Sequence, residues 1–248
     1  MSNLITFPSI FGSITLYKND NAFVNVFTEG KYWEYSIITK LIDYIPEIGT
    51  ILDIGGHCGT HSIAYANLRP KTNIITFEPQ SKIREVLDIN IRQNDITNIT
   101  VNPNACGHKT CTLRLAFDFS SDGYDKKITV NYNSDIGMNF GGIGLTNDPR
   151  GEKVNVITID SLNLNDVVFI KIDVEGAEKM TIFGARETIK RCKPVLLVEE
   201  SDKNVSTQFS ELNNFNTEEF LRSIGYTRED LGESNYLYIL SEMGENGV

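Results

Sequence analysis

Several features that would place the chain in a membrane or in an oxidising compartment are missing. Four cysteines (Cys58, Cys106, Cys111 and Cys192) have spacings that form neither a CxxC pair nor a zinc ligand set. No run approaches the ~18 consecutive apolar residues of a membrane span, and the N-terminus has no basic segment followed by a long apolar stretch. We therefore expect a soluble, cytoplasmic protein with reduced thiols and no membrane partner.

Positive charge is also scarce. Lysine and arginine total 23 against 33 aspartates and glutamates, which gives a net charge of -10. Such a field repels phosphate backbones and anionic lipids. The only adjacent basic pairs are Lys126-Lys127 and Lys190-Arg191, which are typical of solvated loop and helix faces. A nucleic-acid partner is therefore not expected.

Apolar runs and helical segments alternate along the chain, which is typical of a parallel sheet covered on both faces. At 248 residues and 40% hydrophobic, the chain fits one domain, 1–248, in which 1–48 is an N-terminal extension with a helix. We predict an α/β, doubly wound, mostly parallel sheet. Its strands are 50–54, 73–78, 99–102, 167–174, 195–199 and 236–240, and its helices are 60–68, 81–93, 175–191 and 217–225.

The segment 107–152 interrupts this alternation. It is rich in Asn, Asp, Ser and Gly, and it contains only short β-like pieces such as 112–117 and 128–132. A structureless loop of that length is unusual in a compact domain. We predict an inserted β-rich segment that packs as a subdomain or serves as a substrate lid.

A glycine-rich turn follows the first predicted central strand. Residues 51–59 read I-L-D-I-G-G-H-C-G, so Asp53 precedes Gly55, Gly56 and Gly59. Glycines let a ligand approach the main chain closely, and the helix that follows offers unpaired N–H groups to a carboxylate. The dinucleotide pattern G-x-G-x-x-G is absent, because His57 and Thr60 stand where it needs glycine.

The acidic residues beside this turn favour S-adenosylmethionine (SAM) over a nicotinamide cofactor. A carboxylate at Asp53 repels a pyrophosphate but accepts hydrogen bonds from an ammonium, directly or through water. Glu78 ends the second strand, followed by Pro79, and is placed to bind the ribose hydroxyls. The third strand ends near Asn104 and Ala105, which are expected to border the adenine.

Several segments resemble the FkbM family of methyltransferases. The run 169–178, F-I-K-I-D-V-E-G-A-E, is similar to the family signature, and Y-W-E at 32–34, F-E-P at 77–79 and N-V-I-T-I-D-S-L at 155–162 match in order. The likeness covers about 14–201 and implies a Rossmann-like class I methyltransferase fold, SAM, and O-methylation of a sugar, glycan or small metabolite. His57 stands where the family more often has a small polar residue, and His61 where an aromatic is usual; both are expected to line the cofactor pocket, with Thr60.

Methyl transfer to a hydroxyl needs a group that removes its proton. The catalytic candidates are Asp173, His57 and Glu175, and Asp173 is expected to contact cofactor or acceptor because it ends the fourth strand at the ligand-binding crevice. Glu34 either closes over the methionine end of SAM or is a surface acid beside a buried Trp33. No metal ligand set is predicted, although Glu199 and Glu200, together with Asp173 and Glu175, leave a Mg²⁺ site open.

Three other interpretations remain. The same fold serves RNA methyltransferases, but the acidic charge opposes a nucleic-acid substrate. A non-catalytic methyltransferase-like binding module is opposed by the intact Asp53, Gly55, Gly59 and Glu78. A nicotinamide-dependent oxidoreductase is opposed by the chemistry of the glycine turn. The sequence does not identify the acceptor or the oligomeric state.

Overall fold

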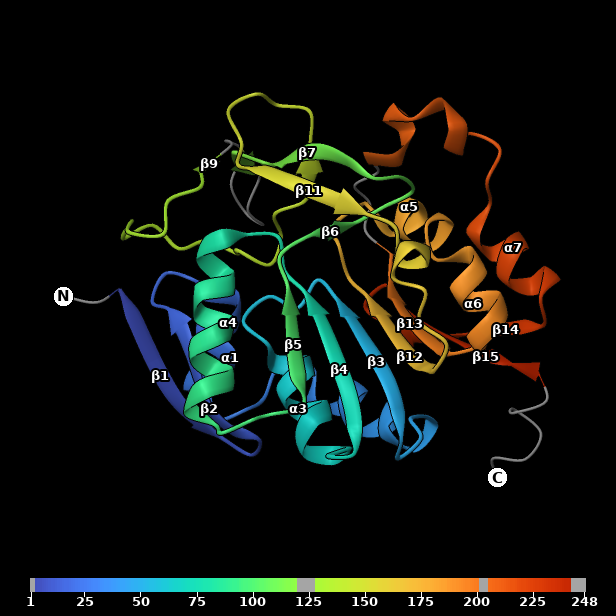
Figure 1. Cartoon of the computed structure of the whole chain (residues 1–248). Coiled ribbons are helices and arrows are strands. Elements are labelled where there is room, and N and C mark those ends of the chain that lie inside the picture. The colour runs from blue at the N-terminus through green and yellow to red at the C-terminus, as the bar shows by residue number, and fades with distance from the viewer. Residues whose placement is uncertain (1–2, 120–127, 201–204, 242–248) are drawn as a thin grey trace.

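The computed structural model describes residues 3–119, 128–200 and 205–241 of the chain. Its central sheet has seven strands in the order β14-β15-β13-β12-β3-β4-β5 (Figure 1). Neighbouring strands from β13 to β5 are parallel, and β15 is antiparallel to both of its neighbours. The strands are β3 (Gly49–Ile54), β4 (Thr72–Phe77), β5 (Ile99–Asn102), β12 (Val167–Ile172), β13 (Val195–Glu199), β14 (Tyr226–Gly232) and β15 (Asn235–Leu240).

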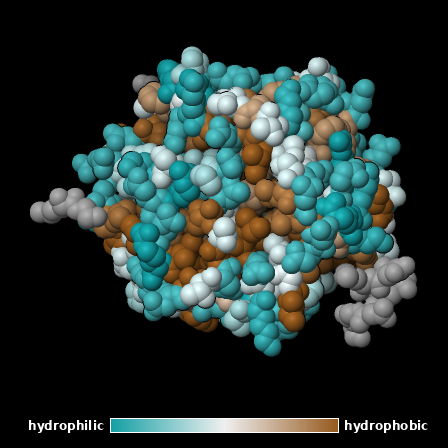
Figure 2. Space-filling view, viewed as in Figure 1, coloured by the Kyte–Doolittle hydropathy of each residue, from teal (hydrophilic) through white to brown (hydrophobic). Residues whose placement is uncertain are grey.

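Helices cover both faces of this sheet because its buried strands alternate side chains between two apolar clusters. In β12, Phe169 packs on the face of α2 (Tyr35–Leu41) and α3 (Thr60–Leu68). Ile170 packs on the opposite face, with α5 (Glu178–Phe183), α6 (Arg186–Cys192) and α7 (Thr217–Ser223). In Figure 2, apolar surface gathers in the middle of the face seen in Figure 1, between α4 (Ser81–Gln93) and α6.

The N-terminal extension contains more than the predicted helix. A hairpin of β1 (Leu4–Ser9) and β2 (Gly12–Tyr17) precedes α1 (Asn21–Thr28), α2 and the 3₁₀ turn η1 (Ile42–Tyr44). Asn90 of α4 fastens the hairpin: its amide group accepts from the Thr15 N–H and donates to the Thr15 carbonyl, at 2.7 and 3.0 Å. The sequence analysis missed this hairpin, although Ile5-Thr6-Phe7 and Ile14-Thr15-Leu16 alternate apolar and polar residues on either side of the turn.

The segment predicted as an insertion contributes to a second sheet in the order β10-β7-β11-β6, which crosses the carboxyl ends of the central strands (Figure 1). Its strands are β6 (Ala105–Cys106), β7 (Cys111–Leu115), β10 (Leu145–Thr146) and β11 (Lys153–Ile157). Phe140, Val156 and Met180 share one buried cluster, so the second sheet packs on α5. The predicted strand pieces are shorter in the structure: β7 ends at Leu115, and β9 (Ile128–Thr129) pairs only with β8 (Asp118–Phe119).

The predicted helix over 175–191 is wrong in one respect: it is two short helices, α5 and α6. Glu175 and Gly176 take φ values of 54° and 97°, in the left-handed region, so α5 begins only at Glu178. At Gly184 the chain passes so close to the second sheet that a Cβ would lie 1.9 Å from the Gly107 carbonyl oxygen. The close approach and the turn chemistry therefore replace a continuous helix with a loop and a break.

The remaining predicted elements agree with the structure within a few residues at their ends. In the described ranges no helix has the length and apolar character that crossing a bilayer requires. The pair Lys126-Lys127 lies outside the described residues. Lys190-Arg191 lies on α6, where Lys190 forms an ion pair with Glu187 at 3.0 Å.

Candidate active site

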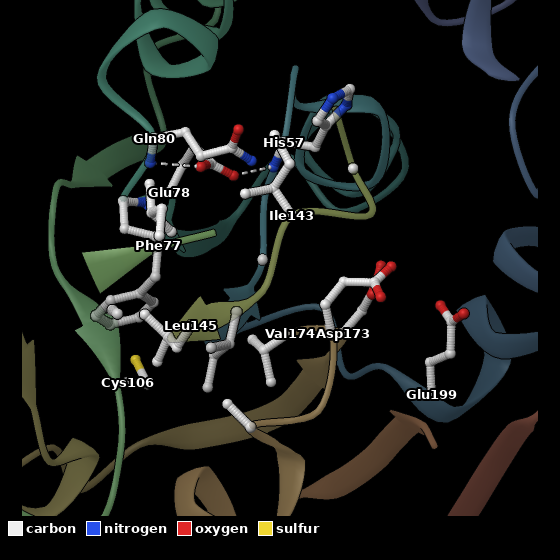
Figure 3. A pocket seen from close by; sticks show the side chains of 18 of the residues that line it. His57, Phe77, Glu78, Gln80, Cys106, Ile143, Leu145, Asp173, Val174 and Glu199 are labelled. Atoms are coloured by element: carbon white, nitrogen blue, oxygen red, sulfur yellow. Dashed lines mark hydrogen bonds between the residues drawn. The ribbon is translucent and has the colours of Figure 1, made fainter. Parts of the chain in front are cut away.

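A cavity of about 230 Å³ lies between the carboxyl ends of the central strands and the second sheet. The strand order reverses between β3 and β12, the place where open α/β sheets bind ligands. Its lining residues, several of which Figure 3 shows, are Phe23, Trp33, Ile54, Gly55, His57, Phe77, Glu78, Pro79, Gln80, Ala105, Cys106, Leu115, Asn139, Gly141, Ile143, Leu145, Asp173, Val174, Glu175, Ala177 and Glu199.

The glycine turn after β3 forms one wall of the cavity. Gly55 has φ +88°, and a Cβ there would lie 1.7 Å from the carbonyl oxygen of Asp173. A Cβ at Gly56 would lie 1.9 Å from the Thr76 hydroxyl. The N–H groups of both glycines donate to the Phe77 carbonyl at 3.0 Å. Glycine is needed at Gly55 because both the left-handed backbone and the close approach exclude a side chain.

Glu78 lies on the cavity wall at the end of β4, where the sequence predicted it (Figure 3). Its Oε2 accepts from the His57 N–H and its Oε1 from the Gln80 N–H, both at 2.8 Å. The side chain is almost fully buried, and this burial raises the pKa of the carboxyl group. Two backbone donors therefore fix the carboxylate, and each oxygen keeps a second lone pair for a ligand.

Asp53 does not lie on the cavity wall, contrary to the placement expected for a residue that binds an ammonium group directly. It is fully buried behind the glycine turn, where the Ser62 hydroxyl of α3 donates to its Oδ2 at 2.5 Å. Its Oδ1 lies 3.7 Å from Nζ of Lys171, the residue paired with it on β12. In β3 the side chain of Asp53 points to the face of the sheet that α3 covers. The turn formed by the next residues reaches the cavity instead.

Carboxylates gather at the other end of the cavity. Asp173, Glu175 and Glu199 all line it, and the Lys171 ammonium donates to Asp173 Oδ2 at 3.0 Å. Burial, together with the nearby Asp173 charge, raises the pKa of Glu199 to about 8, although Lys171 opposes this. Glu200 faces elsewhere: it forms an ion pair with Arg228 at 3.3 Å and is not part of the cavity wall.

His57 reaches the cavity through its backbone more than through its ring. The imidazole stacks on Phe23 with ring centres 4.3 Å apart, and Phe23 stacks on Trp33 at 4.0 Å. The Nε2 atom lies 3.2 Å from Asp20 Oδ2. Burial lowers the pKa of His57, but Cys58 and Asp20 outweigh burial and raise it. Because Nε2 faces Asp20 and not Asp173 or Glu175, this geometry gives no support to the catalytic role predicted for His57.

Six other predicted cofactor residues are outside the cavity wall: Glu34, Gly56, Gly59, Thr60, His61 and Asn104. The Glu34 carboxylate lies 2.6 Å from Nε2 of His61, whose Nδ1 lies 3.0 Å from the Tyr65 hydroxyl. Gly59, with φ +93°, caps α3 and leaves room for Leu87. Glu34, Gly59 and His61 therefore lie on or against α3 rather than on the cavity wall, and Asn104 donates to Asn102 Oδ1 beyond the end of β5. Gly55, His57, Glu78, Pro79, Ala105, Asp173 and Glu175 are the predicted residues that do line the cavity.

The apolar side of the cavity was missed by the sequence interpretation. Its wall combines Phe77 and Cys106 with Leu115, Ile143 and Leu145 of the second sheet and the segments around it. In Figure 3, Phe77, Cys106 and Leu145 lie together, away from Asp173 and Glu199. Lys171 was missed as well, although a lysine inside the apolar run 167–172 is a signal that a buried partner exists.

Within residues 3–119, 128–200 and 205–241, no group of three or more His, Cys, Asp and Glu side chains is arranged to hold a metal ion. The Mg²⁺ site that the sequence left open therefore has no support. Lys171 occupies the position beside Asp173 where a cation would neutralise the carboxylates.

The fold is a Rossmann-like class I methyltransferase fold. Its features are the doubly wound sheet with an antiparallel β15, the glycine turn after β3 and the acid that follows β4. The model of the FkbM methyltransferase domain matches residues 53–228, most of the chain. The chain belongs to the FkbM methyltransferase family. None of the curated proteins compared with it gives a significant sequence match.

Among solved structures, the chain is similar to an FkbM methyltransferase from Methylobacillus flagellatus KT, with 20% identity and a TM-score of 0.50. The similarity covers 77% of this chain but 43% of that one, so it shows the shared fold alone. Two further similar structures are a precorrin-6y C5,15-methyltransferase from Geobacter metallireducens GS-15 (14% identity, 83% and 87% coverage, TM-score 0.44) and a SAM-dependent methyltransferase from Aquifex aeolicus (13%, 90% and 95%, 0.42).

Proposed function

We propose that this methyltransferase transfers the methyl group of SAM to a hydroxyl group of a sugar, a glycan or a small metabolite. The observation that carries the proposal is that one cavity joins two chemically different ends. Glu78 and an apolar slot lie at one end, and Asp173, Glu175 and Glu199 lie at the other. The first end suits a nucleoside, and the second suits removal of a hydroxyl proton.

The residues present fit SAM. Gly55 leaves the main chain open to close approach, Glu78 has lone pairs for the ribose hydroxyls, and the slot beside Phe77 and Leu145 suits an adenine ring. Bound there, SAM supplies a methyl group activated by a sulfonium. Because Asp53 lies behind the turn, we assign the ammonium of the methionine part to the carboxylate end of the cavity rather than to direct contact with Asp53.

Asp173 is our candidate base. The acceptor oxygen attacks the methyl carbon, the bond between that carbon and sulfur breaks, and the hydroxyl proton passes to the carboxylate. Lys171 donates to Asp173 Oδ2 in a charge-assisted hydrogen bond, which holds the carboxylate at the cavity wall. Glu175 and Glu199 make this end acidic, so a neutral or cationic acceptor suits it better than a phosphate-bearing one. The net charge of -10 opposes a nucleic-acid acceptor for the same reason.

The test is calorimetric titration with SAM and with S-adenosylhomocysteine, followed by mass spectrometry of a panel of sugars, glycans and small hydroxylated metabolites. The wild-type protein is expected to bind both nucleosides. Glu78→Gln is expected to weaken binding by about 10- to 100-fold, since charge-assisted hydrogen bonds to the ribose contribute about 1.5 to 3 kcal/mol.

Glu85→Gln is the matched control, because Glu85 lies on α4, is not on the cavity wall, and forms an exposed ion pair with Lys82 at 2.8 Å. It is expected to bind both nucleosides like the wild type. Folded wild-type protein that binds neither nucleoside would contradict the proposal. Binding followed by methylation of an amine alone would contradict the hydroxyl specificity.

A further inference from the structure

We propose that Lys171 is a positioning residue of the methyl-transfer site, which joins the glycine turn to the Asp173 carboxylate and holds both in place. This inference rests on the function proposed above and adds a residue to its machinery. Lys171 lies on β12, is almost fully buried, and does not line the cavity itself. It acts through the two groups that its ammonium holds.

The register of the sheet explains why one lysine reaches both groups. Lys171 pairs with Asp53 on β3 and with Leu197 on β13, so these three side chains form one row across the sheet. Two positions further along the chain are Gly55 and Asp173, just past the ends of β3 and β12, and Glu199, the last residue of β13. All three line the cavity. The side chain of Lys171 therefore starts beside Asp53 and extends its ammonium towards Gly55 and Asp173.

The contacts agree with this arrangement. The Lys171 ammonium donates to Asp173 Oδ2 at 3.0 Å and to the Gly55 carbonyl at 3.3 Å. Asp53 Oδ1 lies 3.7 Å away on the opposite side, and it is a buried oxygen that accepts no hydrogen bond. The ammonium thus contacts two groups of the cavity wall, Asp173 and Gly55, and lies near the buried Asp53 carboxylate. Since Gly55 is part of the turn that the cofactor approaches, movement of the lysine would displace turn and carboxylate together.

The charges around Lys171 show what it compensates. Asp53, Asp173 and Glu34 act on it from three different elements, and they raise its pKa against the opposing effect of burial. Glu199 and Glu175 add two more carboxylates around Asp173. Without the Lys171 ammonium, Asp173 would lose this ion-pair partner and would face Glu175 and Glu199 at the same end of the cavity.

A purely structural role predicts a different result. A buried ion pair often stabilises a fold no better than apolar residues of similar volume, and removal of both partners is tolerated better than removal of one. The informative variant is therefore Lys171→Gln with Asp53→Asn, which removes the Lys171–Asp53 pair together and leaves Asp173 without its cation. Lys171→Arg keeps the charge but replaces the compact ammonium with a planar guanidinium. Lys190→Met, at an exposed pair on α6, is the control.

We expect two changes in K171Q/D53N. The acidic limb of the pH profile of kcat/KM, measured with SAM and the best acceptor of the panel, moves up by at least about one pH unit. The dissociation constant of S-adenosylhomocysteine, measured by calorimetry without turnover, increases about 10-fold because the glycine turn loses its anchor. K171R keeps the wild-type acidic limb and loses at least about 10-fold in kcat, and K190M matches the wild type.

A folded K171Q/D53N protein with an unchanged pH profile and unchanged nucleoside affinity would overturn the inference. If K171Q/D53N does not fold, the kcat of K171R is the deciding measurement. A wild-type kcat in K171R would then overturn the inference. Failure of the proposed function gives another pattern, since the wild-type protein would then bind no S-adenosylhomocysteine or methylate no hydroxyl.

Discussion

The two walls of the cavity are built differently. The wall formed by the turns after β3, β4 and β12 is tied by backbone hydrogen bonds, such as those from Gly55 and Gly56 to Phe77 and from the Asp173 N–H to the Ile54 carbonyl, all at 3.0 Å. The opposite wall comes from the second sheet and contributes mainly apolar side chains. They include Leu145 of the two-residue strand β10 and Ile143 just before it. We call the first the rigid wall and the second the apolar wall. The groups suited to cofactor chemistry lie on the rigid wall, and the groups that shape the space lie on the apolar wall.

The largest effect is expected on the rigid wall. Gly55→Ala places a Cβ 1.7 Å from the Asp173 carbonyl oxygen in a backbone with φ +88°, so the turn must shift. We expect SAM binding to weaken by about 100-fold or more, because shifts of about 1 Å in positioning groups have effects of this size. Calorimetry with SAM is the measurement.

Gly232→Ala is a matched control for this variant. Gly232 has nearly the same φ, +86°, but a Cβ there meets nothing within 4 Å. Both variants place a side chain in a left-handed backbone, but Gly232 is not on the cavity wall, so the pair separates a general loss of stability from an effect at the glycine turn. Equal SAM affinities of Gly55→Ala and Gly232→Ala would show that the rigid wall tolerates displacement. The two walls would then not differ in the way described above.

The rigid wall is also the part that the sequence predicted best. The apolar strand ending in D-x-G and the strand ending in Glu78 are local patterns, and the residues at such strand ends must meet at one edge of a parallel sheet. The position of the crevice at the carboxyl ends of these strands follows from the same rule. The family resemblance, carried mainly by residues 169–178, is confirmed by the match to the FkbM domain model.

The rest depended on contacts between distant segments. Whether Asp53 faces the cavity or the helix behind it is decided by the twist of the turn and by Ser62, and no local pattern records that choice. The apolar wall requires Ile143 and Leu145 to return over β4, across a segment whose sequence shows only turn residues and short β-like pieces. Lys171 was visible as a charge in an apolar strand, but its partners were not.

A smaller effect is expected on the apolar wall. Leu145→Ala removes part of the slot surface and is expected to weaken SAM binding by about 3- to 10-fold, with little change in Tm, because the side chain is only partly buried. Leu164→Ala, at a partly buried leucine that is not on the cavity wall, should leave the affinity unchanged. A loss as large as that of Gly55→Ala would show that the two walls contribute equally to cofactor binding.

The smallest predicted effect concerns Glu199, at the end of the cavity that Asp173 and Glu175 also line. We call this end the acidic end. The pKa of Glu199 is about 8 in the folded protein, against 4.5 as its ordinary value, mainly because of burial and Asp173. Between these two pH values the folded state holds a proton that the unfolded chain has lost, so this group destabilises the fold progressively as pH rises. Glu199→Gln lacks that titration.

We therefore expect the unfolding free energy of the wild type, relative to Glu199→Gln, to fall by on the order of 1 kcal/mol between pH 5 and pH 9. Urea unfolding at a series of pH values measures this difference. Glu85→Gln, at the surface pair with Lys82, should show a constant offset from the wild type instead. Parallel curves for wild type and Glu199→Gln would mean that Glu199 titrates like an exposed glutamate. The acidic end would then be hydrated, and Lys171 would face less repulsion among the carboxylates than the geometry of the site indicates.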